Sequence, residues 1–387
     1  MFKKEKNNDY LTIKESREII KYNIRQMKYY EAQKRIKRSE SEYTAPMHDE
    51  NNVVEIDDLH TSFFTDRGTV KSVDGVSFSI PKNKIVGVVG ESGCGKSVTS
   101  LSIMQLVAAP QGQITGGSIR FNSDKLGYNE EGKKLGFDVT KMPTEEMHKI
   151  RGQDITMIFQ EPMTSLNPVM RVGLQVRETL LLHRKISPQE AKAEVLRIFR
   201  KVGISEPERR YNCYPHELSG GLRQRVMIAM AMICRPKLVI ADEPTTALDV
   251  TVEAQILQLM RALRDETGSG IVIISHNLGV IAQLCDYVYV MYAGRVVEQA
   301  DTFDLFAHPM HPYTAGLMAA VSSLARGNGA LEIIPGAVPN LLHLPAGCSF
   351  SPRCSKCSTH CGDVVPELRE VSSGHLVRCI NIPEVRL

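Results

Sequence analysis

The sequence predicts an α/β protein built on a phosphate-binding loop, and three stretches carry this prediction. Apolar residues at 85–89 are followed by a glycine-rich stretch at 90–97 and then by a segment, 98–106, of helical composition. Further apolar runs at 238–241 and 271–274 each end in polar residues. Strand, glycine loop and helix in this order are the context in which such a loop binds phosphate. We therefore expect a sheet core with its ligand site at the ends of these strands.

The overall composition is that of a globular protein outside the membrane. The 387 residues suggest two or three domains, and 42% hydrophobic with 24% charged residues is ordinary for globular chains. We find neither 18 consecutive apolar residues nor an apolar signal-peptide core after the basic N-terminus, so we expect a cytoplasmic protein. The net charge of +3 does not argue for nucleic acid as a partner.

Residues 1–52 are expected to form a basic N-terminal extension and linker. Residues 1–38 carry twelve Lys/Arg and five Asp/Glu, a balance of +7. Within them, Ile20, Ile24, Met27 and Tyr30 recur at helical spacing. One interpretation is a solvated helix or frayed tail; the other is a basic amphipathic arm that touches anionic lipid or a membrane partner.

The glycine-rich stretch fits the pattern G-x-x-x-x-G-K-[ST]. Gly90 and Gly95 let the backbone turn tightly, because no Cβ blocks the ligand. Lys96 should reach the β- and γ-phosphates, and the Ser97 hydroxyl should bind Mg²⁺. The alternative is an ordinary glycine-rich turn. The remaining predicted nucleotide contacts are Glu91, Ser92, Gly93, Cys94 and Val98.

Two carboxylates end the strand predicted at 238–241. Asp242 suits a residue that holds Mg²⁺ beside Ser97, and Glu243 suits a base that takes a proton from an attacking water. The alternative is a pair of surface acids. His276 also ends a strand of this sheet, which would allow it to contact a γ-phosphate or a water.

A second anion site is predicted at Ser219, Gly220 and Gly221. Ser219 suits a helix N-cap, and the glycines leave backbone N–H groups exposed. Since one nucleotide does not need both sites in one subunit, we expect this one to serve a nucleotide held by another subunit.

In their order and spacing, these motifs resemble the nucleotide-binding subunits of ABC transporters, over roughly residues 53–306. The resemblance implies a P-loop NTPase fold of the ABC type, with a mixed sheet core, an antiparallel β subdomain and a helical signature subdomain at about 161–235, within a domain spanning 53–310. It further implies that Phe63, or its competitor Phe64, stacks on adenine and that Gln160 senses Mg²⁺ and the permease. It implies that Ser219, Gly220 and Gly221 close over the ATP bound by the partner subunit. Asp249, within Ala247-Leu248-Asp249, would be the D-loop acid, and His276 would be the H-loop histidine.

A narrower resemblance, to oligopeptide/dipeptide importer ATPases, rests on four stretches: 161–168, 245–252, 311–314 and 347–354. Within that group the chain is similar to the D-type subunit. This implies a distinct F-type ATPase as partner, two integral membrane permease subunits, indirectly a solute-binding protein, and a peripheral place on the cytoplasmic face of the membrane.

The same group implies a small Cys-rich C-terminal extension at 311–387 with a [4Fe–4S] cluster. Zn²⁺ is the physical competitor at such thiolates, and free thiols in a loose tail are the third possibility. Cys357 is an extra thiol that leaves the ligand set open. The implied ligands are Cys348, Cys354, Cys361 and Cys379.

We expect ATP hydrolysis coupled to the import of di- or oligopeptides. Import of nickel or another small solute is an alternative within the same class. A rival from another class is a soluble ABC ATPase without a permease, acting in DNA repair or translation. A third is a regulatory subunit with a dead site, against which Glu243 and the signature argue.

Overall fold

The computed structural model describes residues 11–161, 165–246, 248–326 and 334–382, with side chains described up to 320 and again from 334. Three predicted features fall partly outside these ranges: Ala247 of the predicted D-loop, residues 162–164 of the stretch after Gln160, and the first ten residues of the N-terminal extension. Within the described ranges, no helix is long and apolar enough to cross a membrane.

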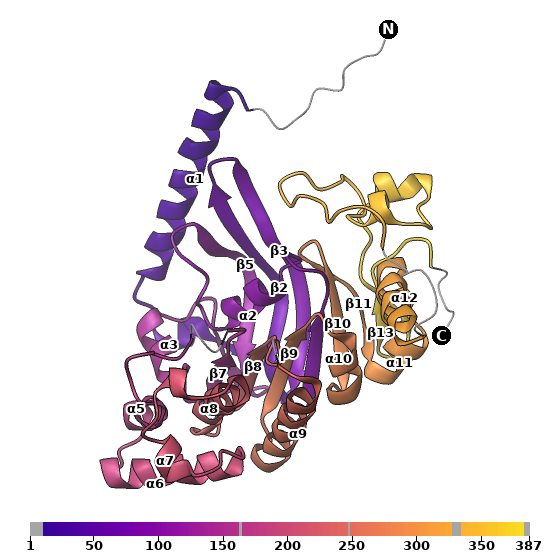
Figure 1. Cartoon of the computed structure of the whole chain (residues 1–387). Helices are drawn as coiled ribbons and strands as arrows, with labels where there is room; N and C mark the ends of the chain where they lie inside the picture. Colours follow the sequence, from indigo (N-terminus) through magenta and orange to yellow (C-terminus); the bar gives the residue numbers. More distant parts are fainter. Residues whose placement is uncertain (1–10, 162–164, 247, 327–333, 383–387) are drawn as a thin grey trace.

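An eight-stranded sheet forms the centre of the molecule, in the order β12-β13-β11-β10-β4-β9-β8-β7 (Figure 1). The neighbours β10, β4, β9, β8 and β7 run parallel, and the other three strands continue the sheet in antiparallel fashion. The bounds are β4 Ile85–Val89, β7 Ile155–Ile158, β8 Leu238–Asp242, β9 Gly270–Ser275, β10 Tyr287–Tyr292, β11 Arg295–Asp301, β12 Arg369–Ser372 and β13 His375–Val377.

The parallel strands are apolar throughout because both faces of the sheet are covered. Every residue of β4, β8 and β9 is buried. Along β4, Ile85 and Val89 join one hydrophobic core while Val86 and Val88 join the other. Alternate side chains of a strand point to opposite faces, so the continuous apolar run is the pattern expected of a strand buried on both sides.

A second, antiparallel sheet packs against this centre, in the order β1-β6-β5-β2-β3. Residues 122–149 are charged and lack an apolar period, which predicts a surface insertion, but they contain the strand β6 of this sheet and most of the helix α3. Phe137 and Met147 from this segment are buried in its core. Short elements of this kind are missed because they are too brief for a period to show. The bounds are β1 Thr44–Pro46, β2 Asn52–Thr65, β3 Gly68–Pro81, β5 Gly112–Phe121 and β6 Leu135–Asp138.

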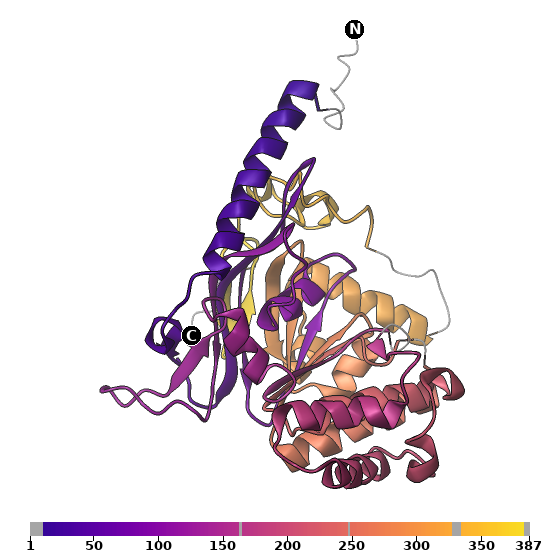
Figure 2. The ribbon, with the colours of Figure 1, turned by 90° about the vertical axis from the view of Figure 1, so that its left-hand side faces the viewer.

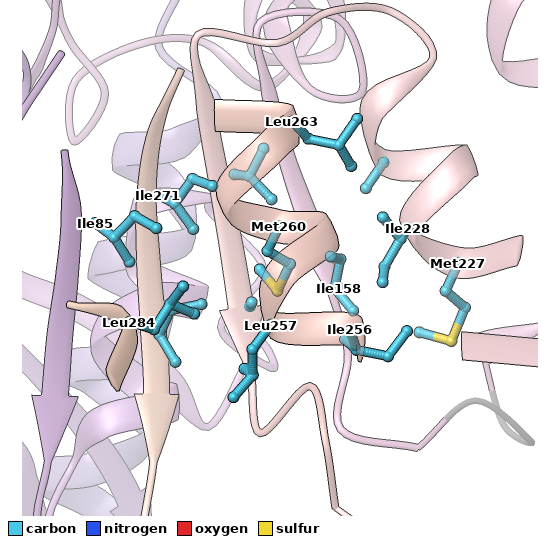
Figure 3. Packing of buried hydrophobic residues seen from close by; sticks show 14 of the residues in the cluster. Ile85, Ile158, Met227, Ile228, Ile256, Leu257, Met260, Leu263, Ile271 and Leu284 are labelled. Atoms are coloured by element: carbon cyan, nitrogen blue, oxygen red, sulfur yellow. The ribbon is translucent and has the colours of Figure 1, made fainter. Parts of the chain in front are cut away.

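Helices cover the central sheet, and a helical group, α5 to α8, lies at one end of the molecule (Figures 1 and 2). In α9, Ile256, Leu257, Met260 and Leu263 share one buried face, which Figure 3 shows packed with Ile271 and Ile228. The bounds are α1 Ile13–Lys34, α2 Lys96–Ile103, α3 Thr144–Ile150, α5 Val172–His183, α6 Pro188–Lys201, α7 Pro207–Arg210, α8 Gly220–Met232, α9 Val250–Thr267, α10 Leu278–Leu284, α11 Thr302–Ala307 and α12 Pro312–Arg326.

Both ends of the described chain pack onto this body. Helix α1 lies along the antiparallel sheet (Figure 1), and its N-cap Thr12 forms a capping box with Glu15. At the other end, β13 pairs with β11 and so adds the C-terminal region to the central sheet. The described N-terminal region is therefore a packed helix and not a frayed tail.

Candidate functional site

Four predicted motifs meet at one edge of the central sheet. The glycine-rich loop follows β4, Gln160 follows β7, Asp242 and Glu243 follow β8, and His276 follows β9. These strands are parallel neighbours, so their carboxyl ends lie together. In sheets of this kind ligands bind outside the carboxyl ends of the strands.

Two positions in the loop admit only glycine. Gly90 has φ +150°, and a Cβ there would lie 2.2 Å from the Met291 carbonyl oxygen. Gly95 has φ +104°, and its Cβ would lie 2.3 Å from the Ser72 carbonyl oxygen. Backbone atoms cannot move aside as a flexible side chain can, so the loop is held tightly against its neighbours.

Lys96 is folded back onto this loop. Its Nζ donates to the carbonyl oxygens of Gly90 at 2.8 Å and Glu91 at 3.0 Å, and the side chain is buried. The ammonium group therefore sits at the mouth of the loop, at the start of α2, where the helix N-terminus adds partial positive charge.

A cavity of about 260 Å³ opens above the loop. Residues of the loop and of α2 line it together with the predicted Gln160 and Glu243. Ser72 of β3 also lines it, although the sequence analysis did not single out this residue. The pattern around Ser72 is that of an ordinary strand, so nothing in the sequence marks it. The lining residues are Ser72, Ser92, Gly93, Gly95, Lys96, Ser97, Val98, Gln160 and Glu243.

Asp242 lies beside Ser97, which lines this cavity. The Ser97 hydroxyl stabilises the charged form of the Asp242 carboxylate. Burial raises the pKa of Asp242, and the neighbouring Glu243 raises it further, against the opposing effects of Ser97 and Lys96. A hydroxyl beside a buried carboxylate is a donor set that suits Mg²⁺, which prefers oxygen ligands.

Glu243 is the most heavily hydrogen-bonded acid of the site. It accepts from Gln160 Nε2 at 2.8 Å and from Thr246 Oγ1 at 3.1 Å, and its Oε1 lies 2.9 Å from His276 Nδ1. Its φ of +48° lies in the left-handed region, which non-glycine residues seldom occupy. Such strain is common at functional positions.

These contacts set the protonation of Glu243. Partial burial pushes its pKa up, but the hydrogen bond and charge of His276, the hydroxyl of Thr246 and the charge of Lys96 outweigh burial. The pKa of Glu243 therefore lies below the ordinary value, and the group is an anion at neutral pH.

The second predicted anion site lies apart from the cavity. Ser219 caps α8, accepting from the Leu222 N–H at 3.4 Å, and both Ser219 and Gly220 are exposed. A Cβ on Gly221 would lie 2.9 Å from Val252 Cγ1, so the start of α8 packs beside the start of α9. Asp249, the exposed N-cap of α9, lies at that same junction.

The structure separates the two predicted aromatic residues. The Phe64 ring is buried and stacks on Tyr30 of α1, with centroids 6.1 Å apart. Phe63 points to the opposite face of β2, is half-buried and lies near Gly112. Helix α1 covers Phe64, and neither ring lines the cavity, so adenine stacking by Phe63 stays a prediction.

Two residues of the C-terminal region hold the phosphate-binding loop. Arg353 donates through Nη1 to Glu91 Oε2 at 2.7 Å and through Nη2 to Glu91 Oε1 at 3.0 Å. The Glu91 backbone N–H donates to Tyr313 Oη at 2.8 Å. Glu91 therefore faces the C-terminal region and not the cavity. Sequence reasoning missed this contact because 262 residues separate its partners.

The four predicted cysteine ligands all lie in the C-terminal region, but the structure does not arrange them as a metal site. Burial raises the pKa of Cys348, Cys354 and Cys379, and each of these thiols also senses charge on another of the four. Among all described residues, however, no group of three or more His, Cys, Asp or Glu side chains is arranged to hold a metal ion. The predicted iron–sulfur or zinc site is therefore not supported.

Comparisons with known proteins agree with this geometry. The sequence profile described as "ABC transporter" matches residues 73–246, and that described as "Oligopeptide/dipeptide transporter, C-terminal region" matches residues 297–361. The probable peptide ABC transporter ATP-binding protein y4tR of Sinorhizobium fredii is 45% identical over 334 residues, 86% of this chain and 96% of that protein. This chain belongs to the ABC transporter family.

Further relatives place this ABC ATPase in the oligopeptide/dipeptide branch. The oligopeptide transport ATP-binding protein OppD of Haemophilus influenzae is 46% identical over 85% of this chain and 97% of its own length. Among solved structures, the dimeric structure of MJ0796, a bacterial ABC transporter cassette, aligns with a TM-score of 0.54 and 25% identity, over 64% of this chain and 98% of that one. The predicted cassette fold with mixed sheets is thus confirmed, whereas the Cys-rich C-terminal extension is not.

Proposed function

We propose that this ABC ATPase binds ATP with Mg²⁺ and hydrolyses it to drive the import of di- or oligopeptides through a membrane permease. The observation that carries the proposal is the meeting of the glycine-rich loop, Gln160, Glu243 and His276 at one sheet edge. Peptides are proposed as cargo because the curated relatives are named for peptide transport. Nickel or another small solute is the alternative, since nothing in the cavity selects a cargo.

Each residue has a task that follows from its place. Backbone N–H groups of the loop and the Lys96 ammonium bind the phosphates. Ser97 and Asp242 would hold Mg²⁺, which when bound offsets the negative charge of the transferred phosphoryl group. Glu243, held anionic by His276 and Gln160, accepts a proton from the attacking water.

We propose that a second ATPase subunit completes each site. Ser219, Gly220 and Asp249 are exposed and lie outside the cavity of their own chain, so they are free to contact a nucleotide bound by a partner. Phe63 would stack on the adenine. The similar cassette MJ0796 is described as dimeric, which supports such a pairing. Our proposed partner is a distinct F-type ATPase, and a second copy of this chain is the alternative.

The permease would dock in an apolar groove beside the helical group. This groove of about 360 Å³ lies between β7, α5 and α8, and its lining includes the exposed side chains of Phe159, Leu182 and Leu106. Gln160 directly follows Phe159, so a docked segment would sit next to a residue that touches Glu243. We therefore place the chain on the cytoplasmic face of the membrane with two permease subunits and, indirectly, a solute-binding protein.

Two finer assignments accompany this proposal. Residues 53–310 would form the nucleotide-binding domain, with 161–235 as its helical subdomain, flanked by the extensions 1–52 and 311–387. A [4Fe–4S] cluster, or Zn²⁺, at Cys348, Cys354, Cys361 and Cys379 is kept only as what the family resemblance implies. An absorption spectrum of anaerobically purified protein distinguishes the cluster from zinc and from free thiols.

The test of the proposal is Glu243→Gln. The substitution keeps the size of the side chain but removes the base, so ATP turnover should fall by about 10²- to 10⁴-fold while ATP binding persists in a closed dimer. The control is Glu194→Gln, on the exposed surface of α6, which should turn over normally. Wild-type turnover by Glu243→Gln would contradict the proposal, and failure to co-purify with membrane subunits would favour a soluble ABC ATPase.

A further inference from the structure

Helix α1 is fixed to the body by its inward face. Asn23 is buried, and its Nδ2 donates to the carbonyl oxygens of Thr65 at 2.6 Å and Gly68 at 3.3 Å, at the turn between β2 and β3. Nearer the C-terminal end of the helix, Tyr30 stacks on Phe64. These contacts fix the rotation of the helix and so determine which side chains face outward.

The outward face carries a stripe of five cations, which we call the basic stripe: Lys14, Arg17, Lys21, Arg25 and Lys28. All five are exposed, and none forms an ion pair with another described residue. Their spacing of three and four residues places them along one side of a helix. The stripe is therefore a row of positive charge without an ion-pair partner among the described residues, and the exposed Glu18 at its edge offsets only part of that charge.

Apolar side chains flank the basic stripe on both sides. Ile13, Ile20 and Ile24 form one ridge and Tyr22 and Tyr29 the other, by the same helical spacing. Their exposed fractions run from 39% for Ile20 to 76% for Ile13. A helix surface that only faces water usually carries few large apolar side chains. A helix that binds the membrane interface, in contrast, combines cations with apolar and aromatic side chains.

The helix shares a face of the molecule with the groove proposed for the permease. Met104 and Leu106 line that groove, while Gln105 and Val107, from the same segment, line a cavity with Tyr30 and Lys34 of α1. Figure 2 shows α1, α3 and α5 together on the side that faces the viewer. A permease seated in the groove would bring this side toward the bilayer.

We propose that the outward face of α1 docks onto an anionic lipid bilayer, with the basic stripe on lipid phosphates and the two ridges in the headgroup region. The proposal rests on the proposed function for the orientation of the molecule. Neither matched family region, 73–246 or 297–361, includes α1, so this contact would be an addition to the common cassette. Nucleic acid is less suited to the surface, because the ridges that border the stripe are aliphatic and tyrosine side chains rather than further cations.

The experiment is sedimentation of the purified full-length chain with lipid vesicles, either phosphatidylcholine alone or a mixture with phosphatidylglycerol, at low and high salt. Each cation near an anionic surface strengthens binding by roughly fivefold, so we expect the wild type to prefer anionic vesicles strongly and to lose that preference in salt. Replacing all five stripe cations with glutamine should weaken binding at least about tenfold, and Ile20→Ser with Ile24→Ser should weaken it without changing the charge.

The matched control removes five exposed cations from the helical group: Lys185, Lys192, Arg197, Arg200 and Arg209. This variant should bind vesicles as the wild type does. The circular dichroism spectrum and thermal unfolding midpoint of every variant are measured alongside, so that a folding failure is recognised independently of ATP turnover. Glu243→Gln should still bind vesicles, which separates failure of this inference from failure of the proposed function. Equal binding to neutral vesicles, an equal loss in the control, or binding to duplex DNA in preference to anionic vesicles would overturn the inference.

Discussion

The contact between Arg353 and Glu91 leads to a quantitative prediction. The Arg353 side chain is 5% exposed and that of Glu91 is 27% exposed, and two hydrogen bonds of 2.7 and 3.0 Å join them. Replacing Arg353 with Met leaves the Glu91 carboxylate half-buried without its partner. Breaking a fully buried ion pair costs about 3–5 kcal/mol, and because water reaches Glu91 we expect about 2–3 kcal/mol here.

The consequence for function comes through the loop backbone. The Lys96 ammonium is held by the Glu91 carbonyl oxygen, so Glu91 links the C-terminal region to the phosphate-binding lysine. If the variant leaves the backbone of Glu91 free to move, ATP binding must order it again, and ordering the backbone of one residue costs about 1–2 kcal/mol. The Kd for ATP should therefore rise about 5- to 30-fold in Arg353→Met.

The assay is a double-mutant cycle with Arg353→Met and Glu91→Gln, in which the Kd for ATP and the resistance to denaturant are both measured. If the two residues act as a pair, the double variant should be little worse than either single variant. The control is Arg120→Met, which breaks an ion pair with Asp57 in the antiparallel sheet and should leave the Kd unchanged. Strictly additive effects, or an unchanged Kd in both single variants, would refute the reasoning.

Four further predictions concern single positions. Lys96→Ala should abolish measurable ATP binding in equilibrium titrations, because the loop loses the cation aimed at the phosphates; normal binding would contradict the assigned role. Gly95→Ala should also lose ATP binding, since its Cβ would meet a backbone carbonyl at 2.3 Å, whereas Gly127→Ala, with open space around it, should not. The His276→Ala variant removes the contact that most lowers the pKa of Glu243, so the effect of burial should raise that pKa. In a plot of ATP turnover against pH, the loss of activity on the acid side should therefore begin at a higher pH. Burial lowers the pKa of His311 to about 4, from an ordinary value of 6.5. Between pH 4 and pH 6.5, His311 is therefore protonated in the unfolded chain but neutral in the folded chain. Acidification from pH 6.5 toward 4 should lower the free energy of unfolding by up to about 1.4 kcal/mol per pH unit. In His311→Gln, denaturation curves measured across this range should show a smaller dependence of stability on pH.

Local pattern was sufficient for the catalytic edge of the sheet. The loop at 90–97 and the acids at 242–243 follow fully apolar runs, and such runs form strands buried on both faces. Parallel strands place their carboxyl ends together, so the residues that follow β4, β8 and β9 could be assigned to one edge of the sheet from the pattern, whereas Gln160 was added by the family resemblance. The family resemblance rested on the same stretches.

Other features depended on contacts between distant parts of the chain. Nothing near Arg353 or Ser72 in the sequence indicates a nucleotide site, and the burial of Phe64 against Tyr30 required knowing where α1 packs. The iron–sulfur prediction came from the family resemblance, whereas metal binding requires ligands at defined distances and angles. The sequence by itself determined which elements form and which chemistry their ends carry, because periodicity and turn residues act locally. Tertiary structure alone decided which side chains meet, since that depends on how each face is buried against the rest of the molecule.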